Sequence, residues 1–555
     1  MQIKYIILCL LCVSLAFQSS QAQLKSKTKT LLNGVEVKDT WPPETNKETE
    51  RKEMPVPYLQ KRQKVIPVNV GRQLFVDSFL IGVTNLNVIY HKPIYSQHPV
   101  LEPDKEWEMT AGGPYASPFS DGIWYDENEN KYKMWYLAGR PAKIRTFYTC
   151  YAESDDGIIW NKPNLKLFGN TNIVDTFRRD ASTIWLDKEE KDVNKRFKMF
   201  TIEKRDYDDF YQVILKYSAN GIQWSRGVAQ SGDMYDRTTT FYNPFSKKWV
   251  LSMRYNAPIG RARSYMENKN PETLVSLAHR IRTTAADQNI IYWFGADNKE
   301  PRNPHFPDID PQIYNHDAIA YESLMLNYFS IWEGPENDVA GKLGIQKRNE
   351  VLIGFSRDGF HITRPSHEPF MGVNESDTNN WNYGNIQSIA GVPIIKGDSL
   401  YFYVSGRRLN KEGWWDAYTS TGLATMRRDG FASINSTTDG YLTTRNIIFD
   451  GNYFFVNADV KEELRVELQD INGKPIHGFT KEDCIPMKTN STKYLIRWKN
   501  NKTVTALKNR DIKVKFFLKK GDLYSFWVSK WKTGESRGYT AGGGPGLNAS
   551  GIDEK

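Results

Sequence analysis

Apolar and polar residues alternate along most of the chain, in short runs that polar turns separate. A period of two is typical of β-strands that bury one face. The first clear run is "RQLFVDSFLI" at 72–81. Long alternating runs return at 453–480 ("YFFVNADVKEELRVELQDINGKPIHGFT") and 513–528 ("KVKFFLKKGDLYSFWV"). The pattern predicts an all-β protein.

A turn motif recurs within this pattern. In "SDDGIIW" (154–160), Asp-Gly predicts a tight turn, and the Trp begins the returning strand. Related stretches are "SANGIQW" (218–224), "AADQNIIYW" (285–293), "SRDGFHI" (356–362) and "RRDGF" (427–431). Their turn residues Asp156, Asn220, Asp287, Asp358 and Asp429 follow at steps of 64, 67, 71 and 71 residues. So steady an interval indicates an internal repeat.

A second element precedes each turn: a strand of small residues, a polar turn and an aromatic-rich strand, as in "GGPYASPFSDGIWYDENENKYKMWY" (112–136). Four of the five repeats share this plan, and the fourth lacks an obvious polar turn. Four strands in each of five repeats predict a five-bladed β-propeller at 66–439. The alternative is a large β-sandwich with coincidental hairpins.

The remaining segments lack the repeat. Residues 23–65 are charged and aperiodic, which predicts a linker or loosely packed arm. The long alternating strands of 440–530 predict a smaller antiparallel β-sandwich. The Gly-rich end, 531–555, predicts a flexible tail.

The N-terminus has the features of a cleaved export signal at 1–22. A basic residue (Lys4) precedes an apolar stretch too short to span a membrane, and "SQA" offers a small-residue cleavage site. No second apolar run of spanning length follows, so we expect a periplasmic or secreted protein without membrane insertion. Cys150 and Cys484 remain after cleavage. They lie in different predicted domains, and their spacing does not decide whether they form a disulfide.

Composition narrows the function. Aromatic residues make up 13% of the chain, which suits a β-rich protein with surfaces that stack on sugars. The formal charge of +9 comes from scattered basic residues, so nucleic-acid binding is not predicted. Solubility explains this excess most simply, and an anionic substrate also fits it.

The repeat plan, with "YKMWY", the "YAESDDGIIW" turn and acidic residues at the predicted inner-strand starts, resembles the five-bladed propeller glycosidases. These form the broad group that contains glycoside hydrolase families 32, 43, 62, 68 and 117. The C-terminal strands are similar to a β-sandwich that accompanies relatives in polysaccharide-degrading bacteria. The resemblance covers roughly residues 72–530. It implies a carbohydrate-active enzyme.

In a propeller, the starts of the inner strands meet at a central funnel. Asp180 ("RRDAST"), Asp236 ("YDRTTT") and Asp317 ("NHDAIAYE") occupy equivalent starts in three consecutive repeats. Glycoside hydrolysis needs one carboxylic acid and one carboxylate, and carboxylates held close cannot all stay ionised. We predict these three as catalytic residues, although Asp at a strand start also caps turns. Glu322 ranks only as a backup acid, because the strand period places it on the opposite face from Asp317 and a bulge would be needed to turn it inward.

Polar residues next to these acids are candidate substrate-binding groups. They are Arg179, Arg237 and His316, together with Tyr115 and Asn385 at inner-strand starts of the first and fifth repeats. The basic groups either tune the acids as ion pairs or bind an anionic sugar through bidentate contacts.

The same groups leave elimination open. A lyase or dehydratase neutralises a uronate carboxylate and removes the adjacent proton with a base, here His316 or one of Tyr115, Tyr235 and Tyr314. Loop tryptophans offer sugar-stacking surfaces or simple packing; they are Trp107, Trp381, Trp414 and Trp415.

We therefore predict an exported glycosidase that cleaves oligosaccharides from a complex polysaccharide, and the sequence leaves open whether that polysaccharide is anionic, that is, uronate- or sulfate-bearing. A lyase or dehydratase on the same scaffold and a non-catalytic glycan-binding propeller are the alternatives. The sequence shows no metalloprotease, phosphate-loop, nucleophile-elbow or Cys/His metal motif, and no cofactor is predicted. Structural calcium is not readable from sequence.

Overall fold

The computed structural model describes residues 27–109, 113–139, 147–204, 210–279, 290–409 and 418–555. The predicted signal peptide, Asp287, Trp414 and Trp415 lie outside these ranges. The described chain is nearly all β, which confirms the predicted class at that level. Its α-helices are α2 (Pro57–Gln60), α3 (Pro271–Leu277) and α4 (Asn337–Leu343). None of the described helices has the length and apolar content to cross a bilayer.

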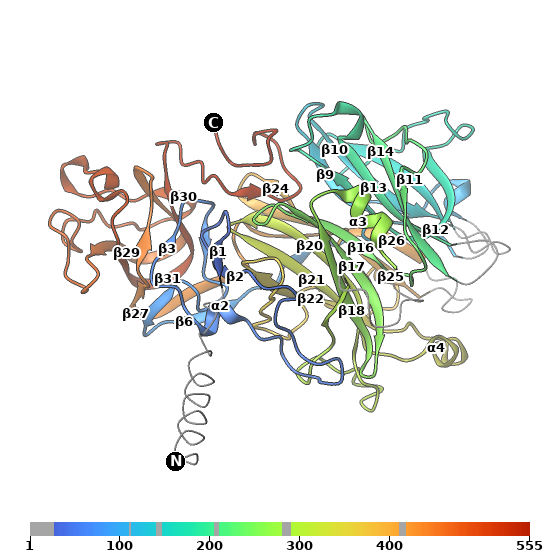
Figure 1. Cartoon of the computed structure of the whole chain (residues 1–555), viewed down its shortest axis with the longest axis horizontal. Coiled ribbons are helices and arrows are strands. Elements are labelled where there is room, and N and C mark those ends of the chain that lie inside the picture. Colours follow the sequence, from blue (N-terminus) through green and yellow to red (C-terminus); the bar gives the residue numbers. More distant parts are fainter. Residues whose placement is uncertain (1–26, 110–112, 140–146, 205–209, 280–289, 410–417) are drawn as a thin grey trace, which may run out of the picture.

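The strands of the middle of the chain form sheets largely in chain order, and nearly all neighbouring strands in them are antiparallel (Figure 1). The first sheet has the order β15-β14-β13-β12-β11-β10-β8, with β9 paired to β10. Its strands are β8 (Ala116–Ser117), β9 (Ile123–Asp126), β10 (Lys131–Ala138), β11 (Phe147–Ser154), β12 (Ile173–Leu186), β13 (Phe197–Lys204), β14 (Tyr211–Ser218) and β15 (Ala229–Gln230). A four-stranded meander follows, with β16 (Thr239–Asn243), β17 (Lys248–Ala257), β18 (Gly260–Asn268) and β19 (Ile291–Phe294).

A nine-stranded sheet completes this region. Its order is β32-β20-β21-β22-β23-β25-β26-β7, with β24 paired to β25. The strands are β7 (Ile94–Tyr95), β20 (Gln312–Glu322), β21 (Leu324–Trp332), β22 (Asn349–Ser356), β23 (Asn385–Ile386), β24 (Ile394–Lys396), β25 (Ser399–Arg408), β26 (Tyr418–Arg427) and β32 (Tyr539–Thr540).

The turn motif has one hydrogen-bond pattern in three copies. The Ser154 hydroxyl accepts from Gly157 N at 2.8 Å, and the Asp156 carboxylate accepts from Ile158 N at 2.8 Å. The copies at 218–224 and 356–362 repeat both contacts. In all three the glycine has a positive φ, which glycine adopts without strain.

These turns connect neighbouring repeats. Trp135 of β10 donates a hydrogen bond to Gly221 O at 2.6 Å, and Tyr403 of β25 donates to Gly157 O at 2.7 Å. The second contact joins the fifth predicted repeat to the first. The first and last repeats are therefore in contact, as a ring of repeats requires.

The C-terminal sheet takes strands from both ends of the chain. Its order is β30-β29-β31-β27-β5, with β4 paired to β31 and β6 to β27. The strands are β4 (Gln73–Leu74), β5 (Ile81–Thr84), β6 (Asn87–Tyr90), β27 (Ala432–Thr444), β29 (Tyr453–Gln469), β30 (Asn490–Leu495) and β31 (Lys513–Ser529). Figure 1 shows the blue N-terminal segment beside the orange strands. Residues 73–90 were predicted to begin the propeller, but their strands β4, β5 and β6 belong to this C-terminal sheet. Phe75, next to β4, packs on Phe516 and Phe526 of β31.

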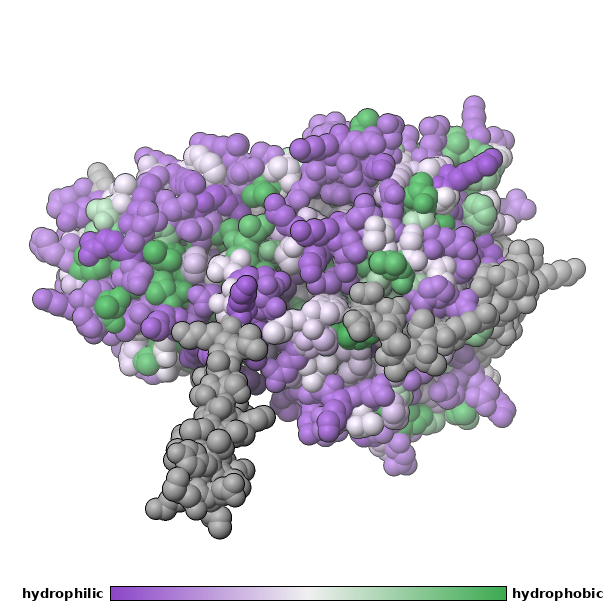
Figure 2. Space-filling view, viewed as in Figure 1, coloured by the Kyte–Doolittle hydropathy of each residue, from purple (hydrophilic) through white to green (hydrophobic). Residues whose placement is uncertain are grey.

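Both flanking segments are folded. The arm predicted at 23–65 contains the hairpin of β1 (Thr28–Thr30) and β2 (Glu36–Lys38), and it buries Val56 and Tyr58. β3 (Ile66–Pro67) pairs with β28 (Ile447–Ile448). The segment 531–555, predicted as a flexible tail, pairs with β20 through β32. The face drawn in Figure 2 is mostly hydrophilic, with hydrophobic residues in small separate groups.

Candidate active site

The three predicted catalytic aspartates lie on neighbouring strands. Asp180 belongs to β12, Asp236 stands just before β16, and Asp317 belongs to β20, while β16 contacts both other strands. Asp180 and Asp317 lie in the middle of their strands, so residues that are far apart in sequence come near the start of β16.

Arg237 connects the first two aspartates. Its Nε lies 3.2 Å from Asp180 Oδ2, and its backbone N–H donates to the same oxygen at 3.3 Å. Its guanidinium carbon lies 4.0 Å from the centre of the Phe119 ring. The backbone of Arg237 has φ +58°, a left-handed conformation that costs a non-glycine residue energy and is found at functional sites.

Asp236 is held as a carboxylate. It forms an ion pair with Arg254. Burial alone would raise the pKa of Asp236, but the guanidiniums of Arg254, Arg237 and Arg261 outweigh burial and hold that pKa below its ordinary value. Asp236 therefore supplies a negative charge at neutral pH.

Asp317 has the opposite character. Its side chain is buried, and Asn315 Nδ2 and Ser388 Oγ donate to Oδ2 at 2.9 and 3.4 Å. Burial raises the pKa of Asp317 to about 7, with a small addition from Asp121, against the lowering effects of Ser120, Arg263 and Ser388. At neutral pH a large fraction of Asp317 is thus a neutral carboxylic acid.

Arg263 lies between these two acids. It is fully buried, donates to Arg237 O at 2.8 Å, and interacts electrostatically with both Asp317 and Asp236. Burial lowers the pKa of Arg263 to about 9, although both carboxylates oppose this shift. One buried cation therefore couples the neutral acid to the ionised one.

Tyr314 lies on the same strand as Asp317 and is surrounded by cations. Lys347 Nζ donates to its hydroxyl at 3.0 Å, and the guanidinium carbons of Arg237 and Arg261 lie 5.3 and 5.2 Å from its ring centre. Burial would raise the pKa of Tyr314, but Arg237, Lys347 and Arg261 lower it to about 7. The phenol ionises near neutral pH.

The predicted substrate-binding residues divide into two groups. Tyr115 and Asn385 lie near this cluster: the Arg407 guanidinium sits 5.8 Å from the Tyr115 ring, and Asn385 Nδ2 donates to Lys347 O at 2.7 Å. Through this hydrogen bond Asn385 positions Lys347. Arg179, in contrast, forms a buried ion pair inside the protein: its Nη2 lies 2.9 Å from Asp121 Oδ1, and both side chains are buried.

His316 lies in the apolar core. Its imidazole is 0% exposed, contacts Trp293, Phe294 and Phe329, and bonds Ser252 Oγ and Asn327 Oδ1 at 3.0 and 3.1 Å. Burial holds its pKa well below the ordinary value. This position gives no access to a substrate, so the binding role predicted for His316 is not supported. Adjacent residues of a strand face opposite sides, and Asp317 takes the side toward the site.

Glu322 is the last residue of β20. Its carboxylate accepts from Arg72 N at 3.0 Å, Arg428 Nη2 at 3.1 Å and Ser536 Oγ at 2.6 Å. Five residues of strand separate it from Asp317, which is roughly 16 Å at the usual rise. Glu322 joins the two regions of the protein and is not a backup acid of this site.

We expect Glu322→Ala to lower the free energy of unfolding by about 3 kcal/mol, because it removes the buried carboxylate that Arg72 and Arg428 share. Urea unfolding measures this, with Glu322→Gln as the milder control that keeps the shape and loses the charge. A Glu322→Ala protein as stable as the wild type but inactive would return Glu322 to the list of catalytic candidates.

The loop tryptophans in the described chain serve packing. Trp381 is 5% exposed and fits against Gly406 and Gly422, where an added Cβ would lie 2.4 and 2.0 Å from the indole. Trp107 Nε1 donates to Asn172 Oδ1 at 3.0 Å. Cys150 and Cys484 are both free thiols, so they form no disulfide.

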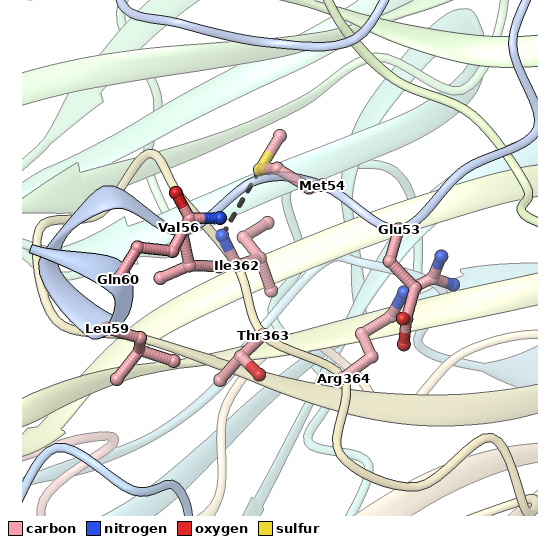
Figure 3. Close-up of a pocket in the computed structure, with 8 residues that line it drawn as sticks. All are labelled: Glu53, Met54, Val56, Leu59, Gln60, Ile362, Thr363 and Arg364. Atoms are coloured by element: carbon pink, nitrogen blue, oxygen red, sulfur yellow. Dashed lines mark hydrogen bonds between the residues drawn. The ribbon is translucent and has the colours of Figure 1, made fainter.

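Two other features lie away from the aspartates. A cavity of about 210 Å³ is lined by residues of the N-terminal arm and by residues 362–364 (Figure 3). Beside it, Ile362 N donates a hydrogen bond to Met54 Sδ at 3.2 Å. One group of potential metal ligands occurs among the described residues: Asp297, Glu300 and His367. Arg364 binds both carboxylates of that group, so an internal cation already offsets one of their two negative charges.

No model of a known protein family matches this chain, and no curated protein matches it in sequence. Solved structures with a similar chain trace are proteins that act on carbohydrates. One is an N-acetylgalactosamine deacetylase from F. plautii in complex with blood group B trisaccharide (11% identity, 62% of this chain, 96% of that chain, TM-score 0.42). A second belongs to the GH130 mannoside phosphorylase family, which contains hydrolases of β-1,2 mannosidic linkages in Candida mannan (13%, 63%, 96%, TM-score 0.36).

A third is a fructofuranosidase from Schwanniomyces occidentalis complexed with fructosylnystose (9% identity, 79% of this chain, 98% of that chain, TM-score 0.36). These proteins are of the propeller glycosidase-like kind that the sequence resembles. At such identities and TM-scores the likeness assigns neither an activity nor a residue role to this chain.

The sequence did not indicate several residues of this site, namely Asp121, Arg254, Arg261, Arg263 and Lys347. Asp121 stands in "SDG", which indicates only a turn. Arg261 is the second residue of β18, and Lys347 lies two residues before β22. Neither belongs to a motif that the sequence repeats, so no sequence signal marked them.

Proposed function

We propose that this protein is an exported, glycosidase-type enzyme on a five-bladed propeller, and that it cleaves oligosaccharides from an anionic polysaccharide. The observation that carries the proposal is the pairing of a neutral acid, Asp317, with an ionised carboxylate, Asp236, through Arg263. Glycoside hydrolysis requires this division of protonation states: one group protonates the leaving oxygen, and the other acts as base or nucleophile.

The anionic part of the proposal rests on the cations at the same site. Arg237, Arg261 and Lys347 surround Tyr314, and none of Arg261, Lys347 and Arg407 forms an ion pair with a carboxylate of the described chain. Such groups bind carboxylate or sulfate through charge-assisted hydrogen bonds. The export signal and cleavage in the periplasm or outside the cell remain part of the proposal.

Incubation of the purified protein with plant and algal polysaccharide digests tests the proposal, with mass spectrometry of the products. We expect uronate- or sulfate-bearing oligosaccharides to give fragments that together have gained one water, while matched neutral oligosaccharides are cleaved far more slowly. Retained binding without any product would instead identify a glycan-binding propeller. Equal cleavage of neutral substrates would remove the anionic requirement.

A further inference from the structure

Hydrolysis by Asp317 and Asp236 assigns no catalytic role to Tyr314. A buried phenol does not need three cations around it for packing, and a phenol beside Lys347 alone would satisfy its hydrogen bond. The arrangement instead favours the phenolate. A phenolate whose pKa is about 7 is available as a general base at neutral pH, a role that neither step of hydrolysis requires from this residue.

The same cations suit a second reaction. When a uronate carboxylate binds Arg237, Arg261 or Lys347, the cation neutralises its negative charge. The proton on the adjacent carbon is then easier to remove. The base must then lie beside the bound carboxylate. Tyr314 does, because its hydroxyl is 3.0 Å from Lys347 Nζ and its ring contacts both guanidiniums.

We propose that this site also cleaves uronate-containing oligosaccharides by β-elimination, with Tyr314 as the base and Asp317 as the acid. The proposal rests on the anionic-sugar binding argued above. The C–H bond next to the carboxylate breaks, and its proton goes to the Tyr314 oxygen. The electron pair forms a C=C bond to the neighbouring carbon, whose C–O bond to the leaving sugar breaks. Asp317 gives its proton to that leaving oxygen.

The step balances without water, oxidant or cofactor. The products are an unsaturated uronate, in which the new double bond is conjugated with the carboxylate, and a sugar with a free hydroxyl. Tyr314 then returns its proton to solvent and Asp317 takes one up. Hydrolysis of the same bond would consume one water and leave no double bond, so the two reactions are separable by mass and by ultraviolet absorbance.

The charged groups that face Tyr314 come from several elements. Arg237 precedes β16, Arg261 is the second residue of β18, and Lys347 precedes β22; all three favour the phenolate. Asp236 opposes them. Arg407 of β25 acts on Lys347 and so reaches Tyr314 indirectly. Elimination needs Tyr314 ionised and Asp317 protonated, which predicts a bell-shaped pH profile with its maximum near pH 7.

The test follows the conjugated product by ultraviolet absorbance while wild type and Tyr314→Phe act on uronate oligosaccharides. We expect wild type to form the unsaturated product and Tyr314→Phe to form it about 10²–10⁴-fold more slowly. Tyr453→Phe, at the start of β29 in the C-terminal sheet, is the matched control and should behave as wild type.

An ultraviolet pH titration gives a readout that does not need substrate. Wild type should show one tyrosine ionising near pH 7, and this signal should be missing from Tyr314→Phe and shifted upward in Lys347→Met. Lys347→Met also keeps the test open if Tyr314→Phe does not fold.

The outcomes separate the two proposals. Saturated fragments that gained water, with no absorbance, overturn elimination and leave the glycosidase proposal standing. Unsaturated product at an unchanged rate from Tyr314→Phe overturns the role of Tyr314. No product from any anionic or neutral oligosaccharide overturns the proposed function itself.

Discussion

Asp236→Asn is expected to lower turnover by about 10²–10⁴-fold while the thermal midpoint changes by no more than about 3 °C. Asparagine keeps the shape of the side chain and an oxygen that can accept from Arg254. It cannot carry the negative charge that Arg254, Arg237 and Arg261 stabilise. The loss should therefore fall on kcat, because the missing charge acts in the transition state.

The small change in stability follows from exposure. The Asp236 side chain is 23% exposed, so solvent screens part of the charge that the variant leaves unbalanced. Asp377→Asn, the same change on an exposed loop, is the control for chemistry-independent effects. Kinetics and thermal melts on all three proteins decide the matter. A fully active Asp236→Asn removes this residue from the site, and joint loss of activity and fold gives it a structural role.

The catalytic candidates could be predicted from sequence because a repeat makes equivalent positions visible. Asp180, Asp236 and Asp317 stand at matching places in three repeats, and the structure places them on contacting strands. Their protonation states could not be predicted. These depend on Arg254, Arg261 and other groups that approach from separate elements, and on burial.

His316 shows the limit of reading neighbours in a strand. It was grouped with Asp317 because the two are adjacent, yet adjacent side chains point to opposite faces. The aromatic residues that enclose His316, such as Trp293 and Phe329, belong to other strands and gave no sign of that pocket in advance.

The domain boundaries differ for a related reason. Residues 73–90 pair with strands more than three hundred positions later, and no local pattern encodes so distant a partner. The Gly-rich C-terminal segment was predicted to be flexible. Its glycines instead permit close packing, since a Cβ on Gly544 would lie 1.7 Å from Ile395 O.

Asp317→Asn is expected to give a protein that is inactive and yet more stable than wild type above pH 7. Burial raises the pKa of Asp317 to about 7, so between its ordinary value and pH 7 the folded state binds more protons than the unfolded chain. Wild type therefore loses stability as pH rises through that window, and the whole penalty is present above it. Asparagine has no charge to bury and avoids the penalty.

Activity should move the other way. Asparagine cannot donate a proton to a leaving oxygen, so turnover should fall by about 10²–10⁴-fold at every pH. Thermal midpoints measured at about pH 5 and about pH 8 should differ between variant and wild type mainly at the higher value. In Ser388→Ala, the loss of the bond that lowers the Asp317 pKa should shift the alkaline limb of the activity profile upward. An Asp317→Asn protein that is less stable at both pH values, or that keeps its activity, would contradict the assignment of Asp317 as the buried neutral acid.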